Sequence, residues 1–147
     1  ISANAKILAS PPSPSGRGAG GEGRVLIYTA STDAVKQFAL RERGADVAVM
    51  QQVEDGLPLS AVLSDLARRG INEVLVEAGK TLNGALLKAG LVDELVLYLA
   101  PQLLGDAARG MANLGVLTQL EQRVELAWQD VRHVGNDIRI TARVKHV

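Results

Sequence analysis

Residues Val74 to Ala89 read V-L-V-E-A-G-K-T-L-N-G-A-L-L-K-A, and this stretch decides the expected fold. A short apolar run ends in one acid, Glu77, and Gly79 follows two residues later. An amphipathic pattern with helical spacing begins at Leu82. The stretch therefore predicts a buried strand, a tight turn and a helix. Because ligands of open α/β sheets bind outside the carboxyl ends of strands, we expect a ligand site at this turn.

The start of the predicted helix is suited to an anion. A helix N-terminus carries backbone N–H groups without intrahelical partners and the positive end of the helix dipole. Structural alternatives remain open for three residues of the stretch. On pattern alone, a surface or capping acid is the favoured interpretation of Glu77, and Gly79 and Gly84 could be a turn residue and a packing residue.

The same strand–helix pattern continues on both sides of this stretch. Apolar runs predict strands at residues 24–29, 46–50, 73–77 and 93–100, with a further short run at 5–9. The three helices between the longer runs are each expected to end at a glycine, namely Gly44, Gly70 and Gly90. The hydroxyls of Thr29, Ser31 and Thr32 are favoured as helix-capping groups over contacts to a nucleotide ribose or phosphate.

The pattern changes from residue 124 onward to strict alternation of apolar and polar residues. Gly135 and Asn136 mark a turn between two alternating runs, which predicts an antiparallel hairpin with one buried face. That face is predicted to carry Val124, Leu126, Trp128, Ile138, Ile140, Ala142 and Val144. The fold class is therefore α/β, with a parallel core sheet made mixed by the hairpin.

The bulk composition excludes several classes of function. The chain has 147 residues, which favours a single domain, and Pro, Ser and Gly dominate residues 10–23, which we interpret as a flexible loop or insertion. The net charge is zero and aromatic residues make up 3%, so no nucleic-acid surface is indicated. There is no cysteine, and the two histidines lie apart, which argues against a metal site. No apolar run approaches the ~20 residues of a membrane span, and we expect a soluble, cytoplasmic protein.

The run N-E-V-L-V-E-A-G-K-T-L-N-G-A-L-L-K-A-G-L-V-D-E-L-V-L-Y-L-A-P-Q-L-L-G, residues 72–105, resembles a known family. This family is the C-terminal reductase domain of the bifunctional riboflavin-biosynthesis deaminase/reductase (RibD-type). The later run R-H-V-G-N-D-I-R-I, residues 132–140, is similar to its C-terminal hairpin. The resemblance implies a dihydrofolate-reductase-like mixed sheet flanked by helices, and a homodimer.

The resemblance also implies a reaction and a site. The family reduces 5-amino-6-(5-phosphoribosylamino)uracil with NADPH, which delivers a hydride to C1 of the ring-opened ribose. The acid at the position of Glu77 is then a substrate contact. The implied contacts to the NADPH phosphates are Gly79, Lys80, Thr81, Leu82, Asn83, Gly84 and Ala85. The catalytic residues are unknown.

Two departures from the family qualify the implied activity. Lys80 stands where the family usually has proline, which places a cation beside the expected phosphates. The zinc deaminase domain and the first part of the reductase domain are not in this sequence, so we expect a truncated site. Two alternatives therefore stay open: a non-catalytic fragment that keeps the fold and a dimer interface, and a related reductase of the same fold with another pyrimidine or pterin substrate.

Overall fold

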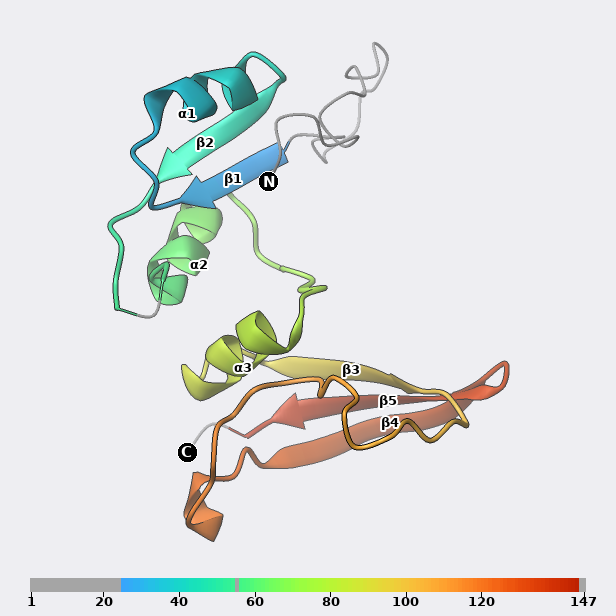
Figure 1. The fold of residues 1–147 in the computed structure, drawn as a ribbon. Coiled ribbons are helices and arrows are strands. Elements are labelled where there is room, and N and C mark those ends of the chain that lie inside the picture. Colours follow the sequence, from blue (N-terminus) through green and yellow to red (C-terminus); the bar gives the residue numbers. More distant parts are fainter. Residues whose placement is uncertain (1–24, 55, 146–147) are drawn as a thin grey trace. The chain divides into compact units, whose positions relative to one another are not determined.

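The computed structural model describes residues 25–54 and 56–145 (Figure 1). The predicted strand at residues 5–9 and the Pro/Ser/Gly-rich segment 10–23 lie outside the described residues. The chain divides into two compact units, Ile1–Asn72 and Glu73–Val147. Each unit is taken by itself below.

The first unit is built on a parallel strand pair. Strand β1 (Val25–Thr29) pairs with β2 (Ala45–Val49), and helix α1 (Ala34–Arg41) connects them. Ile27, Leu40 and Ala45 form its buried core. A second helix, α2 (Leu59–Arg68), begins directly after Pro58. These elements confirm the strand–helix alternation that the sequence predicts for this part of the chain.

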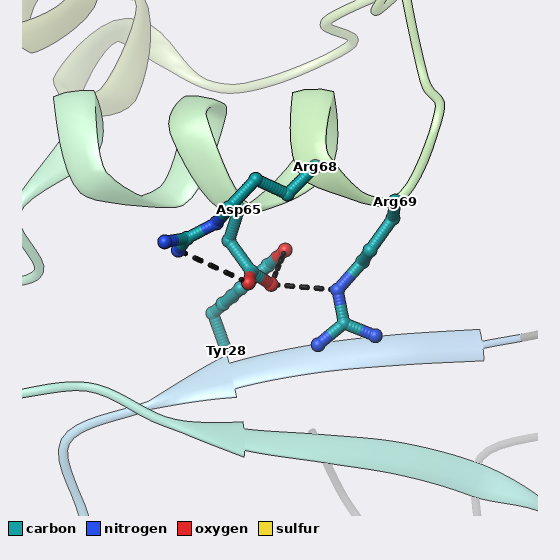
Figure 2. A network of polar contacts seen from close by, with 4 residues as sticks. All are labelled: Tyr28, Asp65, Arg68 and Arg69. Atoms are coloured by element: carbon teal, nitrogen blue, oxygen red, sulfur yellow. Dashed lines mark hydrogen bonds and ion pairs between the residues drawn. The ribbon is translucent and has the colours of Figure 1, made fainter.

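A polar network joins α2 to β1 (Figure 2). The hydroxyl of Tyr28 donates to Oδ2 of Asp65 at 2.8 Å, and Nε of Arg69 donates to the same oxygen at 2.6 Å. Arg68 reaches the other carboxylate oxygen at 3.4 Å. The Asp65 side chain is only 19% exposed, so this carboxylate is a partly buried tie between the helix and the strand.

The second unit holds one helix and an antiparallel sheet. Helix α3 spans Lys80–Lys88 and is followed by β3 (Glu94–Leu99). A long connection containing a short 3₁₀ helix (Leu120–Gln122) leads to the hairpin of β4 (Leu126–Val134) and β5 (Asp137–Val144). The strand order is β3-β5-β4, so β5 is central.

The hairpin turn has the predicted chemistry. Val134 pairs with Asp137, which leaves Gly135 and Asn136 as a two-residue loop. Gly135 has φ of 61°, whereas Asn136 is not in the positive-φ region. A glycine with positive φ at the first loop position is typical of a type II′ turn, whose twist matches that of the two strands.

The apolar face of this sheet is only partly buried. The strand register places Leu95, Ala142 and Trp128 side by side on one face, as the alternation predicts. Ala142 is fully buried, but Trp128 is 62% exposed and Val131 is 59% exposed. The prediction of a buried hairpin face is therefore wrong for the β4 side, because none of the described residues of the second unit covers these two side chains.

One predicted element is absent from the described structure. Residues 71–79 form neither helix nor strand, and Leu75 in the expected buried strand is 79% exposed. The prediction of a buried strand at residues 73–77 is therefore wrong. A strand needs hydrogen-bonded neighbours, and a parallel strand needs cover on both faces. Within the described residues, this apolar run has neither.

Candidate functional site

The N-terminus of α3 is open. Its N-cap residue, Gly79, has extended backbone angles and supplies no side-chain cap. The first intrahelical bond runs from the N–H of Asn83 to the carbonyl of Gly79, at 3.1 Å. The N–H groups of residues 79–82 therefore have no intrahelical acceptor and form the positive end of the helix dipole. A Cβ added at Gly79 would meet no atom within 4 Å, so the space beside this turn is open.

The side chains around this turn are accessible. Glu77, Lys80 and Thr81 are all exposed. Glu77 has no hydrogen bond or ion pair to any other described residue. The turn therefore presents a cation at the helix start and an unpaired carboxylate three residues earlier. This arrangement favours a ligand that carries both an anionic group and hydrogen-bond donors.

The later part of the predicted set is engaged within the protein. The side-chain amide of Asn83 donates to the carbonyl oxygens of Ala78 and Met111, at 3.3 and 3.0 Å. Gly84 is buried, and a Cβ placed on it would lie 2.2 Å from the carbonyl oxygen of Asn113. The structure thus brings all seven predicted cofactor residues into one helix start, but only residues 79–82 offer free N–H groups.

The N-terminus of α1 is finished differently. Asp33 caps it by accepting from the N–H of Lys36 at 3.0 Å. The hydroxyl of Ser31 accepts from the N–H of Asp33 at 3.3 Å, and that of Thr29 accepts from Ser31 at 3.0 Å. Asp33 alone provides the side-chain N-cap, and the hydroxyls of Ser31 and Thr29 make local bonds just before the helix, so the capping interpretation is not confirmed for Thr29, Ser31 or Thr32.

The first unit carries two hollows. The larger, of about 560 Å³, is lined by Arg41 and Arg69 among others. The smaller, of about 250 Å³, lies at the start of α1 and includes Asp33 and Lys36. Because the carboxylate of Asp33 already caps the helix there, it would repel an anion at that end.

Asp65 and Tyr28, in the network between α2 and β1, have shifted pKa values. The pKa of Asp65 is held below its usual value, chiefly because Arg69 donates to it and then because Tyr28 does. The pKa of Tyr28 is raised by desolvation and by its bond to Asp65. These shifts match the geometry of a tie between α2 and β1, and they give no sign of an acid or base poised for catalysis.

Two further polar residues lie away from the α3 turn in sequence. His133 lies within β4 and pairs with Ile138. Arg109 is exposed in the connection after β3.

No helix in the ranges 25–54 and 56–145 is long and apolar enough to cross a membrane.

The parallel strand pair of the first unit and the antiparallel sheet of the second unit, together with the helices of both units, define a mixed α/β fold class. Residues 19–140 match the family of the RibD C-terminal domain, and the chain belongs to that family. This confirms the resemblance seen in the sequence and its α/β fold class.

Individual relatives agree with this assignment. The riboflavin biosynthesis protein RibD of Escherichia coli K12 is 48% identical over 56% of this chain, which corresponds to 22% of that protein. The 5-amino-6-(5-phosphoribosylamino)uracil reductase of Buchnera aphidicola is 32% identical over 59% of the chain and 42% of its own length. The structure of Acinetobacter baumannii RibD superposes with a TM-score of 0.70 and 30% identity over 83% of this chain and 31% of that one. The chain therefore spans less than half of each of these proteins.

Proposed function

We propose that this chain contributes part of the NADPH and substrate site of a riboflavin-biosynthesis reductase. The reaction would reduce 5-amino-6-(5-phosphoribosylamino)uracil to its ribitylamino product. The observation that carries the proposal is the uncapped start of α3 directly after an exposed acid, Glu77. Membership of the RibD C-terminal domain family and the named activity of the Buchnera relative support it.

The residues at the start of α3 fit a cofactor phosphate. The N–H groups of residues 79–82 would donate to phosphate oxygens, and the ammonium group of Lys80 would add a positive charge. A proline at position 80 would preset the helix start but lack an N–H, so Lys80 contributes one more donor to the turn. The open space beside Gly79 allows the phosphate to approach the backbone. NADPH, when bound, would supply the hydride.

Glu77 is the proposed substrate contact. An ionised carboxylate only accepts hydrogen bonds, so its partners would be hydroxyl or N–H groups of the substrate. Its exposure and its lack of a partner among the described residues leave both oxygens available. In this role, the substrate would lie beside the apolar run Val74–Val76 and the cofactor phosphates beside the start of α3.

A ligand-dependent stability measurement tests the cofactor proposal. A ligand at 100 times its Kd raises the free energy of unfolding by about 2.7 kcal/mol. We expect NADPH to raise the thermal midpoint of the wild-type chain, and Lys80→Ala to reduce the rise. Lys36→Ala, at the capped start of α1, is the matched control and should leave the rise unchanged. A midpoint that does not move with either NADPH or NADH would refute the cofactor proposal.

The Glu77→Gln variant tests the substrate role separately. Glutamine keeps the size of the side chain but replaces one acceptor with a donor. In an active preparation, we expect NADPH oxidation by substrate to fall while the Kd for NADPH stays within twofold. Unchanged turnover would remove Glu77 from the proposed site.

The homodimer is also part of the proposal. Trp128 and Val131 are exposed on the apolar face of the sheet, and β3 and β4 are its edge strands. An apolar face of this kind is typical of a subunit interface. Sedimentation velocity should give a dimer, and Trp128→Lys should shift the chain toward the monomer. A monomeric wild-type chain at high concentration would contradict this part.

A further inference from the structure

The connection after β3 docks onto the start of α3 at one short segment, residues 111–113. The N–H of Asn113 donates to the carbonyl oxygen of Lys80 at 2.8 Å. The amide of Asn83 donates to the carbonyl oxygen of Met111 at 3.0 Å. Two independent bonds therefore hold this segment against the first turn of the helix. Figure 1 shows the connection running back from the far end of β3 along the sheet.

Counting the hydrogen-bond donors of Asn83 decides what its side chain can do. A side-chain amide has two N–H donors, and its oxygen only accepts. Both bonds of the Asn83 nitrogen go to carbonyl oxygens, those of Ala78 and Met111. Carbonyl oxygens cannot donate, so the orientation of the amide is settled by its partners. The Asn83 side chain then has no N–H donor left for a phosphate. Only its amide oxygen is free, and this acceptor would repel a phosphate oxygen.

Gly84 serves the same contact. Its missing side chain makes room for the backbone of Asn113, whose oxygen, carbon and nitrogen atoms would lie 2.2, 2.6 and 2.7 Å from an added Cβ. Backbone atoms cannot rotate away from such a clash as the end of a flexible side chain can. Gly84 is also beyond the four N–H groups that precede the first intrahelical bond. The space left by the missing side chain of Gly84 is therefore filled by the docked segment and not by a ligand.

We propose that Asn83 and Gly84 are positioning residues that hold segment 111–113 as one wall of the cofactor-phosphate site. This inference rests on the proposed function and divides the site residues by role. Residues 79–82 contact the phosphate, whereas Asn83 and Gly84 act through the docked segment. Since the bond from Asn113 ends on the carbonyl of Lys80, the segment holds the peptide unit that follows Lys80. Releasing the segment frees the turn to open and scatters the donors that face the phosphate.

Hydrogen exchange and cofactor affinity, measured on the same variants, test this role. The first readout is the exchange rate of the Asn113 amide without ligand, and the second is the Kd for NADPH by titration calorimetry. Asn83→Ala should speed the exchange at Asn113 at least tenfold and raise the Kd about tenfold. Asn136→Ala, at the exposed hairpin turn, is the matched control and should change neither. Amides of β5 provide an internal check that the unit stays folded.

A second substitution guards against a variant that fails to fold. Asn83→Asp keeps the shape of the side chain but removes both donors, so it should release Asn113 and weaken NADPH binding in the same proportion. Asn83→Gln keeps the donors and should recover part of both. Faster exchange at Asn113 with a Kd within twofold of wild type would overturn the positioning role. A wild-type chain that binds no NADPH, with Asn113 still protected, would instead overturn the proposed function and with it this wall.

Discussion

The first and third helices both begin after a turn, but their N-termini are finished in opposite ways. At α1, Asp33 accepts from the N–H of Lys36, and the hydroxyls of Ser31 and Thr29 make local bonds in the turn just before the helix. At α3, Gly79 offers no side chain, and no cap bond is made. At α1, the N–H groups of Asp33 and Lys36 are engaged within the protein, and the carboxylate of Asp33 stands at the helix start. At α3, no side chain accepts from the first N–H groups, which stay available to a ligand.

The difference has an energetic consequence. An N-cap side chain contributes about 1 kcal/mol to helix stability. The α3 start forgoes this contribution and is tied instead by the bond from Asn113 to Lys80. A local rule broken at one position, with compensation nearby, is typical of functional sites. Four substitutions test whether this comparison holds.

The largest effect is expected from giving α3 the cap that α1 has. Gly79→Asp places a carboxylate at an N-cap whose φ of −85° and ψ of 170° suit it. The carboxylate would occupy the free N–H groups and repel a phosphate. We expect NADPH affinity to fall about 100-fold, or about 2.7 kcal/mol, while the free energy of unfolding rises by about 1 kcal/mol. Calorimetric titration and urea denaturation measure the two terms. Unchanged affinity would mean that the phosphate lies elsewhere.

A smaller effect, a loss of folding stability, is expected from crowding the docked segment 111–113. Gly84→Ala forces a Cβ against the backbone of Asn113, and overpacking of this kind costs about 1–3 kcal/mol. The better helix propensity of alanine offsets up to about 1 kcal/mol of this. Gly110→Ala is the matched control, because its Cβ would meet only the oxygen of Ala112 at 3.9 Å. Urea denaturation of both variants checks the prediction, and equal stabilities would show that the segment is loosely held.

Removing the cap from α1 should affect stability alone. Asp33→Ala loses the bond to the Lys36 N–H and should lower the free energy of unfolding by about 1 kcal/mol. Thr32→Ala, next to it in sequence, should change stability by much less, because Thr32 does not supply the cap. NADPH affinity should be the same in both variants. A loss of affinity in Asp33→Ala would place α1 in the site and blur the comparison.

The smallest effect on the free energy of unfolding is expected at α2. This helix begins after Pro58 and, like α3, has no side-chain cap. It is held by Asp65, whose pKa is lowered first by Arg69 and then by Tyr28. The unfolded chain therefore binds a proton more readily than the folded one. The stabilising contribution is present above the ordinary aspartate pKa, about 3.9, and is lost as the pH falls through the lower folded value.

Asp65→Asn should flatten the dependence of the unfolding free energy on pH in this acid range. Denaturation at a series of pH values measures it. Asp106→Asn serves as the comparison, because Asp106 is exposed in the connection after β3 and takes no part in the α2–β1 tie. An equal flattening in both variants would show that the tie does not set the acid sensitivity.

Much of the secondary structure could be predicted because its signals are local. The glycines predicted to end the helices, Gly44, Gly70 and Gly90, all have positive φ in the structure. The alternation after residue 124 identified the hairpin, and Gly135 its turn. These features depend on side-chain period and backbone freedom within a few residues. The candidate site at the start of α3 was also proposed from the sequence, through the predicted turn and helix and the family resemblance, and it stays a prediction.

The failures involve partners that are distant in sequence. The run Val74–Val76 has the composition of a buried strand, but a strand exists only where another strand pairs with it. The exposure of Trp128 likewise depends on what covers the sheet, which alternation cannot reveal. Neither the α2–β1 tie nor the docked segment 111–113 has a sequence signature. Tyr28 and Asp65 are 37 residues apart, and Asn83 and Met111 are 28 apart.

The sequence by itself determined the helices, their glycine ends, the hairpin and the family, because each is written in short-range pattern or in a run of matching residues. Only the tertiary structure showed which residues at the start of α3 contact other parts of the protein and which keep free N–H groups. The free N–H groups at positions 79–82 follow from helix geometry, whereas the roles of Asn83 and Gly84 follow from the backbone that happens to lie beside them. A glycine or an asparagine can serve in a packing contact or in a ligand site. The residue type is the same in both roles, and only the neighbouring atoms show which role it has.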